Sequence, residues 1–242
     1  MTLDDQYREA IRRAVAGLGA LDPSDLSFQV PSCPEWDLEA LVAHLATIHH
    51  WAAGLLRAGL NERFSRRDVG APPPGAQVLG WLDAGSKLAL AALEEDLDRP
   101  VRTWAGEQPA RWWLRRLAHE SSMHAWDGLS AVGRSFIVKP PLAVDAINET
   151  FDLFVPILFR HDLFAGHGET MHLHATDAAG EWHVTFDPGV ARTERLHTKA
   201  DVAVRGPAFE LLLLLWGRRQ IKELEVFGNE EILERFRAAA QF

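Results

Sequence analysis

The sequence has one cysteine and no long apolar run. Cys33 is the only cysteine among 242 residues, so no disulfide can form within the chain, as is usual in a reducing compartment. The longest apolar run, FELLLLLWG at 209–217, is too short to cross a bilayer. The acidic, amphipathic start MTLDDQYREAIRRAV does not have the pattern of a secretion signal. We therefore expect a cytoplasmic protein.

Basic residues are also few. Lys and Arg number 25 against 34 Asp and Glu, giving a net charge of −9, whereas a partner rich in phosphate needs a basic surface. We expect neither nucleic acid nor a membrane as partner, and a small-molecule substrate instead. Phosphate-binding glycine loops, G-x-S-x-G and C-x-x-C are all missing from the sequence. The composition is compatible with a monomer or a homodimer.

Hydrophobic periodicity predicts helices first and strands later. Apolar residues recur at helical spacing in five segments: 3–19, 37–59, 75–97, 109–131 and 140–160. Pro156 should kink the fifth helix or end it early. After about residue 165, apolar and polar residues alternate in TMHLHAT and in EWHVTFD, and the turn-like DAAG between them predicts a hairpin. ADVAVRG and LEVFGN are further strand candidates between helical segments. The prediction is an α+β fold with a helical domain at 1–163 and a small α+β domain at 164–242.

Helical geometry turns three ionisable side chains toward the interior of the helical domain. At about 100° per residue, His44 shares the apolar stripe of its helix, whereas His50 falls on the polar side and should be solvated. On the fourth helix, Glu120 and His124 are about 40° apart on the inner face, and His119 is rotated away. A buried carboxylate needs a cation, a donor or a metal.

Two interpretations of these residues remain open. Glu120 and His124 can form an intrahelical pair, with His44 a satisfied core histidine. Alternatively all three bind one metal ion, since an i, i+4 pair and a third ligand from a facing helix leave coordination positions open, as in catalytic sites. His172 and His174 share one face of a predicted strand, and we interpret them as the polar face of a sheet. Nothing in the sequence near Cys33 indicates a lowered thiol pKa.

Two helical motifs resemble a known family. VPSCPEWDLEALVAHLATIHHWAAGLLRAG and RRLAHESSMHAWD are similar to signatures of the mycothiol-dependent maleylpyruvate isomerase family. The segments MHLHATDAAGEW, ADVAVRGPAFELLLLLWGR and LEVFG are similar to its second domain, so the resemblance spans nearly the whole chain.

The resemblance implies a fold and a site. The fold would be an N-terminal DinB-like four-helix bundle followed by a small α/β domain resembling sterol carrier proteins. A divalent metal, zinc or else nickel or another ion, would be held by His44, Glu120 and His124. Mycothiol would be the thiol cosubstrate. Beside such a site, Asp127 is a candidate to orient a ligand, or else a structural helix carboxylate. Arg218 or Arg219, at the end of LLLLLWGRR, is a candidate to bind a substrate carboxylate, or else a charge that interacts with the helix dipole.

The resemblance does not fix the reaction. One expectation is a metal-dependent thiol enzyme, either a cis–trans isomerase of the maleylpyruvate type or a thiol S-transferase. A second is a non-catalytic carrier of a small or lipid-like ligand with a structural metal. A third is a DinB-like metal hydrolase, which would need a spare general base such as Asp127 or His119 beside the ion.

Overall fold

The computed structural model describes residues 2–240, and the chain divides into two compact units. The first unit ends at Ile137 and the second begins at Val138. This division falls earlier than the expected boundary near 163, because the first part of the helix predicted at 140–160 packs against a later helix of the second unit. The prediction placed that helix in the first domain because it follows the other helices in the sequence, but its packing partners place it in the second unit.

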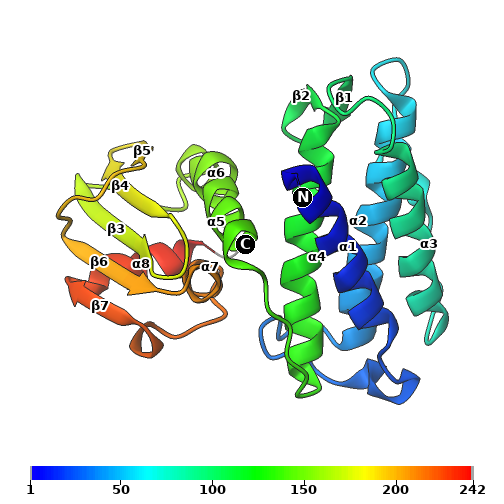
Figure 1. Cartoon of the computed structure of the whole chain (residues 1–242), viewed down its shortest axis with the longest axis horizontal. Coiled ribbons are helices and arrows are strands. Elements are labelled where there is room, and N and C mark those ends of the chain that lie inside the picture. Colours follow the sequence, from blue (N-terminus) through cyan, green and yellow to red (C-terminus); the bar gives the residue numbers. More distant parts are fainter. Residues whose placement is uncertain (1, 241–242) are drawn as a thin grey trace. The chain divides into compact units, whose positions relative to one another are not determined.

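Four long helices build the first unit (Figure 1). They are α1 (Leu3–Gly19), α2 (Leu38–Ala58), α3 (Gln77–Ala92) and α4 (Arg111–Ala131). The pairs α1 with α4, α2 with α3, α1 with α3 and α2 with α4 are in contact, so the helices surround one core. Between α3 and α4 the chain forms a two-stranded hairpin, β1 (Pro100–Thr103) and β2 (Gly106–Pro109), where we predicted no regular structure.

The predicted start and end of α2 are confirmed, and they fix the helix that carries His44. Asp37 caps its N-terminus by accepting a 2.8 Å hydrogen bond from the backbone N–H of Ala40. Gly59 follows the last turn with φ of 59°, a conformation that a side chain disfavours. By contrast, α3 ends at Ala92, whereas the prediction extended it to about 97. At this end the Arg99 guanidinium donates a 2.6 Å hydrogen bond to the carbonyl of Ala92.

Pro156 changes the fifth predicted helix without stopping it. The chain forms α5 (Pro140–Glu149), then a π-helical turn over Thr150–Phe154, and then α6 (Val155–Arg160). Proline lacks a backbone N–H and its ring crowds the preceding turn, so the helical backbone widens locally just before Pro156.

A five-stranded sheet forms the rest of the second unit. Its strands lie in the order β5-β4-β3-β6-β7, and only β3 and β6 are parallel. They are β3 (Glu169–Ala175), β4 (Glu181–Asp187), β5 (Val190–Glu194), β6 (Val202–Gly206) and β7 (Glu225–Gly228), with α7 (Ala208–Leu215) before β7 and α8 (Glu230–Ala239) after it. The prediction missed β5.

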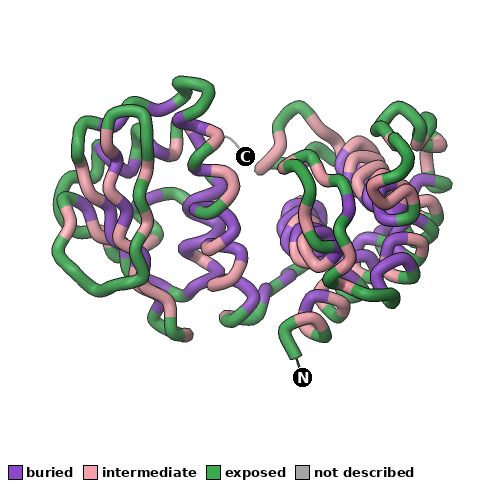
Figure 2. The backbone as a smooth tube through the Cα atoms, turned by 90° about the horizontal axis from the view of Figure 1, so that it is seen from above, coloured by how far each residue is buried: buried purple, intermediate pink, exposed green. Residues whose placement is uncertain are grey.

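Helices cover one face of this sheet. Buried and half-buried stretches both occur in the second unit (Figure 2). Along β4 they alternate residue by residue, and the buried set includes Trp182 and Phe186. Trp182 donates a 2.8 Å hydrogen bond to Asn148 on α5, and Phe186 stacks on Phe236 of α8. The side chains of His172 and His174 therefore lie on the opposite face. In the part of the chain that the structure describes, no helix combines the length and the apolar character that a membrane span requires.

Candidate metal centre

The structure brings His44, Glu120 and His124 together between α2 and α4. Nε2 of His44 lies 3.1 Å from Oε1 of Glu120, and Nε2 of His124 lies 3.4 Å from the same oxygen. Two imidazole nitrogens and one carboxylate oxygen, contributed by two helices far apart in the sequence, thus converge on one point. We refer to these three residues as the trio.

The spacing of the trio fits a divalent ion. Because zinc binds nitrogen and oxygen at about 2.0–2.2 Å, the donor atoms of a tetrahedral site lie about 3.3 Å apart. The observed 3.1 and 3.4 Å agree with this spacing. The side chains of His44, Glu120 and His124 are 22%, 17% and 10% exposed, so solvent reaches the trio from one side. If the trio binds an ion, three protein ligands at a partly exposed point are the arrangement of a catalytic rather than a structural metal site.

Arg116, which the sequence analysis did not single out, holds the other oxygen of Glu120. Its Nη2 lies 2.7 Å from Oε2, and the arginine itself is buried. Burial would raise the pKa of Glu120, but the Arg116 charge and the hydrogen bonds from both histidines of the trio hold that pKa well below its usual range. Glu120 is therefore ionised at neutral pH with Oε1 directed at the two imidazoles.

Asp127 orients His124. Its Oδ2 lies 3.1 Å from Nδ1 of His124, and its Oδ1 accepts a 2.5 Å hydrogen bond from the hydroxyl of Ser32. Burial would lower the pKa of His124, but the hydrogen bonds to Asp127 and Glu120 raise it to about 9. With the Nδ1 proton held by Asp127, Nε2 is the atom that faces Glu120 and His44.

The turn before α2 packs against the trio and Asp127. Cys33 follows Ser32, and its Sγ lies 3.9 Å from Oδ2 of Asp127. The Trp36 ring packs against the rings of both His44 and His124, with centroids 4.7 and 5.9 Å apart. The V-P-S-C-P-x-W motif thus supplies the contacts around the trio.

Arg66 lies on the solvent side of His44. Its Nη2 is 3.4 Å from Nδ1 of that ring, and the Arg66 side chain is exposed. A metal ion on Nε2 leaves the imidazole proton on Nδ1. Arg66 would then have to turn away, which an exposed side chain can do.

The other histidines of the first unit have separate contacts. His49 is fully buried and lies 2.9 Å from the hydroxyl of Ser121, and burial lowers its pKa to about 4. His50, which we predicted to be solvated, instead stacks on Trp81 of α3 and lies 3.1 Å from its carbonyl oxygen. The prediction for His50 was wrong because α3 covers that side of α2. The ring of His119 contacts Tyr7, away from the trio.

Arg218 belongs to the second unit, whereas the trio and Asp127 belong to the first. Its Nη1 donates a 2.7 Å hydrogen bond to the carbonyl of Trp216, and its guanidinium lies over the Trp216 ring. The neighbouring Arg219 is bound to both carboxylate oxygens of Glu210. Arg219 is thus held by a bidentate ion pair.

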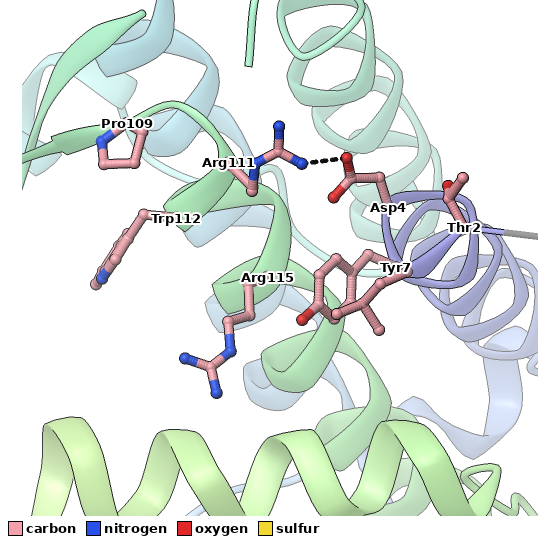
Figure 3. Close-up of a pocket in the computed structure, with 8 residues that line it drawn as sticks. Thr2, Asp4, Tyr7, Pro109, Arg111, Trp112 and Arg115 are labelled. Atoms are coloured by element: carbon pink, nitrogen blue, oxygen red, sulfur yellow. Dashed lines mark hydrogen bonds and ion pairs between the residues drawn. The ribbon is translucent and has the colours of Figure 1, made fainter. Parts of the chain in front are cut away.

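A cavity of about 430 Å³ lies between the starts of α1 and α4 (Figure 3). Arg111 of α4 and Asp4 of α1 form an ion pair across it. Its lining residues are Thr2, Leu3, Asp4, Tyr7, Pro109, Arg111, Trp112 and Arg115. None of them belongs to the trio, so this cavity is a separate feature of the contact between α1 and α4.

Comparison with known proteins covers both units. Residues 7–127 match the family model described as the mycothiol maleylpyruvate isomerase N-terminal domain. Residues 141–235 match the model of the C-terminal domain of the same family. No curated protein matched the sequence. The two family matches together leave only short segments of the chain uncovered.

Two solved structures have a similar fold. One is a crystal structure of a mutant of the mycothiol-dependent maleylpyruvate isomerase, with TM-score 0.68 and 14% identity, covering 92% of this chain and 90% of that chain. Another crystal structure of the mycothiol-dependent maleylpyruvate isomerase gives TM-score 0.65 and 15% identity, covering 89% of this chain and 88% of that chain. At these identities the likeness establishes the shared α+β fold.

Proposed function

This chain belongs to the mycothiol maleylpyruvate isomerase family, and from that premise we propose that it is a divalent-metal-dependent enzyme that uses mycothiol as its thiol. The favoured reaction is cis–trans isomerisation of a maleylpyruvate-type substrate, with thiol S-transfer as the alternative. The observation that carries the proposal is the convergence of the trio at 3.1 and 3.4 Å on a partly exposed point.

Each residue around the trio has a stated task in this proposal. His44, Glu120 and His124 would hold the ion, zinc being the first expectation for two imidazoles and a carboxylate. A divalent ion there would lower the pKa of a coordinated thiol and present its sulfur as a nucleophile near neutral pH. Arg116 keeps Glu120 ionised, and Asp127 keeps the proton of His124 on Nδ1.

The isomerisation needs no nucleophile from the protein. A bound thiol would supply the nucleophile: its addition across a cis double bond conjugated with carbonyls would leave a carbon–carbon single bond that can rotate, and its loss would restore the double bond in the trans form. Cys33 lies near Asp127 but is not required for either step. The role of the chain is to bind, orient and activate the thiol.

The hydrolase alternative is less well supported. It requires a general base beside the ion that is not already engaged. Both oxygens of Asp127 are engaged, one by Ser32 and the other by His124, and the His119 ring contacts Tyr7. These contacts favour the thiol enzyme over hydrolysis by metal-activated water.

Substitution of Arg218 tests the proposed binding of a substrate carboxylate. Arg218→Met should raise KM for maleylpyruvate at least tenfold and leave the bound metal and the affinity for mycothiol unchanged. Arg219→Met serves as the comparison, because it breaks the ion pair with Glu210 and should affect stability more than KM. An unchanged KM in Arg218→Met would remove that residue from the proposal.

The decisive experiment follows the thiol on the metal. The protein is loaded with cobalt(II), mycothiol is added, and the sulfur-to-metal charge-transfer absorption is recorded beside isomerase activity on maleylpyruvate. Wild-type protein should gain the absorption band and interconvert the cis and trans isomers. His44→Ala should lose cobalt and both signals, whereas His50→Ala, which removes an imidazole of the same helix outside the trio, should keep them.

The outcomes separate the alternatives. An unchanged cobalt spectrum after addition of mycothiol would contradict the thiol-enzyme proposal even where the ion is bound. A thiol band without isomerisation, together with transfer of mycothiol to another electrophile, would favour the S-transferase. Loss of activity in His50→Ala equal to that in His44→Ala would contradict the assignment of the trio.

A further inference from the structure

A second cluster of metal-ligand side chains lies in the second unit, on the sheet face that the helices do not cover. His172 and His174 project from β3, Glu181 from the start of β4, and His197 from the connection that follows β5. Three histidines and one carboxylate from three segments therefore meet at one place. We call these four residues the sheet cluster.

The contacts within the sheet cluster all pass through Glu181. Nε2 of His172 lies 2.6 Å from Oε2 of Glu181, and Nδ1 of His197 lies 3.1 Å from Oε1. Nδ1 of His174, which faces Glu181 directly across the β3–β4 pair, lies 2.5 Å from Oε1. Donor atoms of His172, Glu181 and His197 lie within 4.8 Å of one another.

We propose that the sheet cluster is a second divalent-metal site, with His172, Glu181 and His197 as ligands and His174 as the fourth donor or as the residue that orients Glu181. Imidazole and carboxylate in this combination favour zinc, and nickel or copper(II) as competitors. The three ligand atoms lie within 4.8 Å of one another, whereas the donors of a tetrahedral zinc site lie roughly 3.3 Å apart, so side-chain movements would complete the site.

The arrangement is poorly explained as simple ion pairing. One carboxylate neutralises one protonated imidazole, but three rings surround Glu181, with centroids 4.9, 5.8 and 6.5 Å apart. Arg205, which faces His174 across the β3–β6 pair, forms an ion pair with Glu225 at 3.5 Å. A metal ion instead uses the nitrogen lone pairs that neutral imidazoles offer.

Burial divides the ligands into a fixed part and a movable part. The His172 side chain is only 6% exposed and is held within the sheet, whereas His197 is 73% exposed and lies on an irregular connection between β5 and β6. An ion bound by both would tie this connection to β3 and β4. Arg195 and Lys199, both exposed, flank His197 and are sites where trypsin can detect that ordering.

The test counts metal ions on the full chain, prepared without a histidine tag. Equilibrium dialysis against zinc, and cadmium-113 NMR, should find two sites in the wild type. His197→Ala removes an exposed ligand and leaves the core intact. It should lose one equivalent, or bind it at least a hundredfold more weakly. His161→Ala, an exposed histidine of the same unit, is the matched control and should keep both sites.

Proteolysis gives a second readout. Zinc should slow trypsin cleavage after Arg195 and Lys199 at least fivefold in wild-type protein and in His44→Ala, but not in His197→Ala. Because His44→Ala removes only the ion of the trio, failure of that site and failure of the sheet cluster are distinguishable. A wild type that binds a single equivalent lost in His44→Ala, or a His197→Ala variant that keeps two, would overturn the proposal.

Discussion

Asp127 offers a test of the candidate metal centre that leaves all three proposed ligands in place. Asp127→Asn keeps the size of the side chain but removes the charge that holds the proton on Nδ1 of His124. Because such carboxylate–histidine contacts set both the ring orientation and the basicity of a ligand, we expect metal affinity to fall by about 10- to 100-fold. Competition with a chromophoric chelator measures this change directly.

Ser32 supplies the graded comparison. Ser32→Ala removes one hydrogen bond to Asp127 but leaves the contact between Asp127 and His124. We expect its effect on metal affinity to be several times smaller than that of Asp127→Asn. If both variants bind the ion as tightly as the wild type, Asp127 does not orient a ligand, and its place beside His124 is only structural.

At the scale of single residues, the sequence predicted those parts of the site that follow from helical periodicity. The inward positions of His44, Glu120 and His124 required only the angle between residues on a helix. Arg116 had a usable signal, since it precedes Glu120 by one helical turn, and it was overlooked. Ser32 had no such signal, because it lies 95 residues from Asp127 in the sequence and only the tertiary fold brings the two side chains together.

The packing of α4 against α1 and α2 depends on the absence of a side chain at Gly128. A Cβ there would lie 2.7 Å from Cδ2 of Leu18 and 3.3 Å from Cδ2 of Leu38, both fully buried. Gly128→Leu should therefore lower the free energy of unfolding by about 1 to 3 kcal/mol through overpacking. Urea denaturation followed by tryptophan fluorescence measures it.

Gly80 is the control for helix propensity. It lies exposed on α3, and a Cβ there would meet no other atom within 4 Å. Gly80→Leu should raise the free energy of unfolding by up to about 1 kcal/mol, because leucine favours the helix over glycine. Equal stabilisation by the two substitutions would show that α4 does not need the small residue.

In the second unit, an ion pair joins the start of β3 to α8 and should give a pH-dependent stability. Arg235 lies 2.7 Å from Glu169, whose other oxygen accepts a hydrogen bond from the N–H of His167. Burial opposes the effect, but these donors lower the pKa of Glu169 to about 2. The stabilisation is therefore present above pH 4.5 and is lost as the pH falls toward 2.

Glu169→Gln should remove that pH dependence. We expect a loss of about 1 kcal/mol at pH 7, a modest value because Arg235 is partly exposed and solvent screens the pair. Denaturation at pH 7 and at pH 3 should show a smaller difference between the two pH values for the variant than for the wild type. Glu9→Gln, on the exposed side of α1, should leave the difference unchanged.

Elements were predictable where local chemistry decides them. The cap at Asp37 and the glycine after α2 gave both ends of that helix. The hairpin of β1 and β2 was missed because its strands have four residues each and little apolar alternation. β5 was missed because it is also short and has no buried residue, and its residues pair with β4 only once the sheet has formed.

At the scale of the whole molecule, the sequence indicated two units and an α+β fold, but not the position of the division. A helix shows in its sequence which face is apolar but not which core covers that face. The helix predicted at 140–160 could therefore be assigned to either unit. Contact between α5 and α7, together with the hydrogen bond from Trp182 to Asn148, assigns it to the second.

The two proposed metal sites make a joint prediction because each lies wholly within one unit. A ligand that binds only the folded state stabilises it by about 2.7 kcal/mol at 100 times its dissociation constant. Each unit has a core of its own, so each ion should stabilise only the unit that binds it. Zinc should thus slow hydrogen–deuterium exchange in both units of the wild type. In His197→Ala it should slow exchange only in peptides of the first unit, and in His44→Ala only in peptides of the second unit.

Tryptophan fluorescence provides an independent check of the same prediction. Seven of the nine tryptophans precede residue 138, so thermal unfolding followed by fluorescence reports mainly on the first unit. Zinc should raise that transition in the wild type and in His197→Ala equally, and should not raise it in His44→Ala. If His44→Ala still showed a zinc-dependent rise of that transition, the two units would unfold as one cooperative body, and the effect of each ion could no longer be assigned to a single unit.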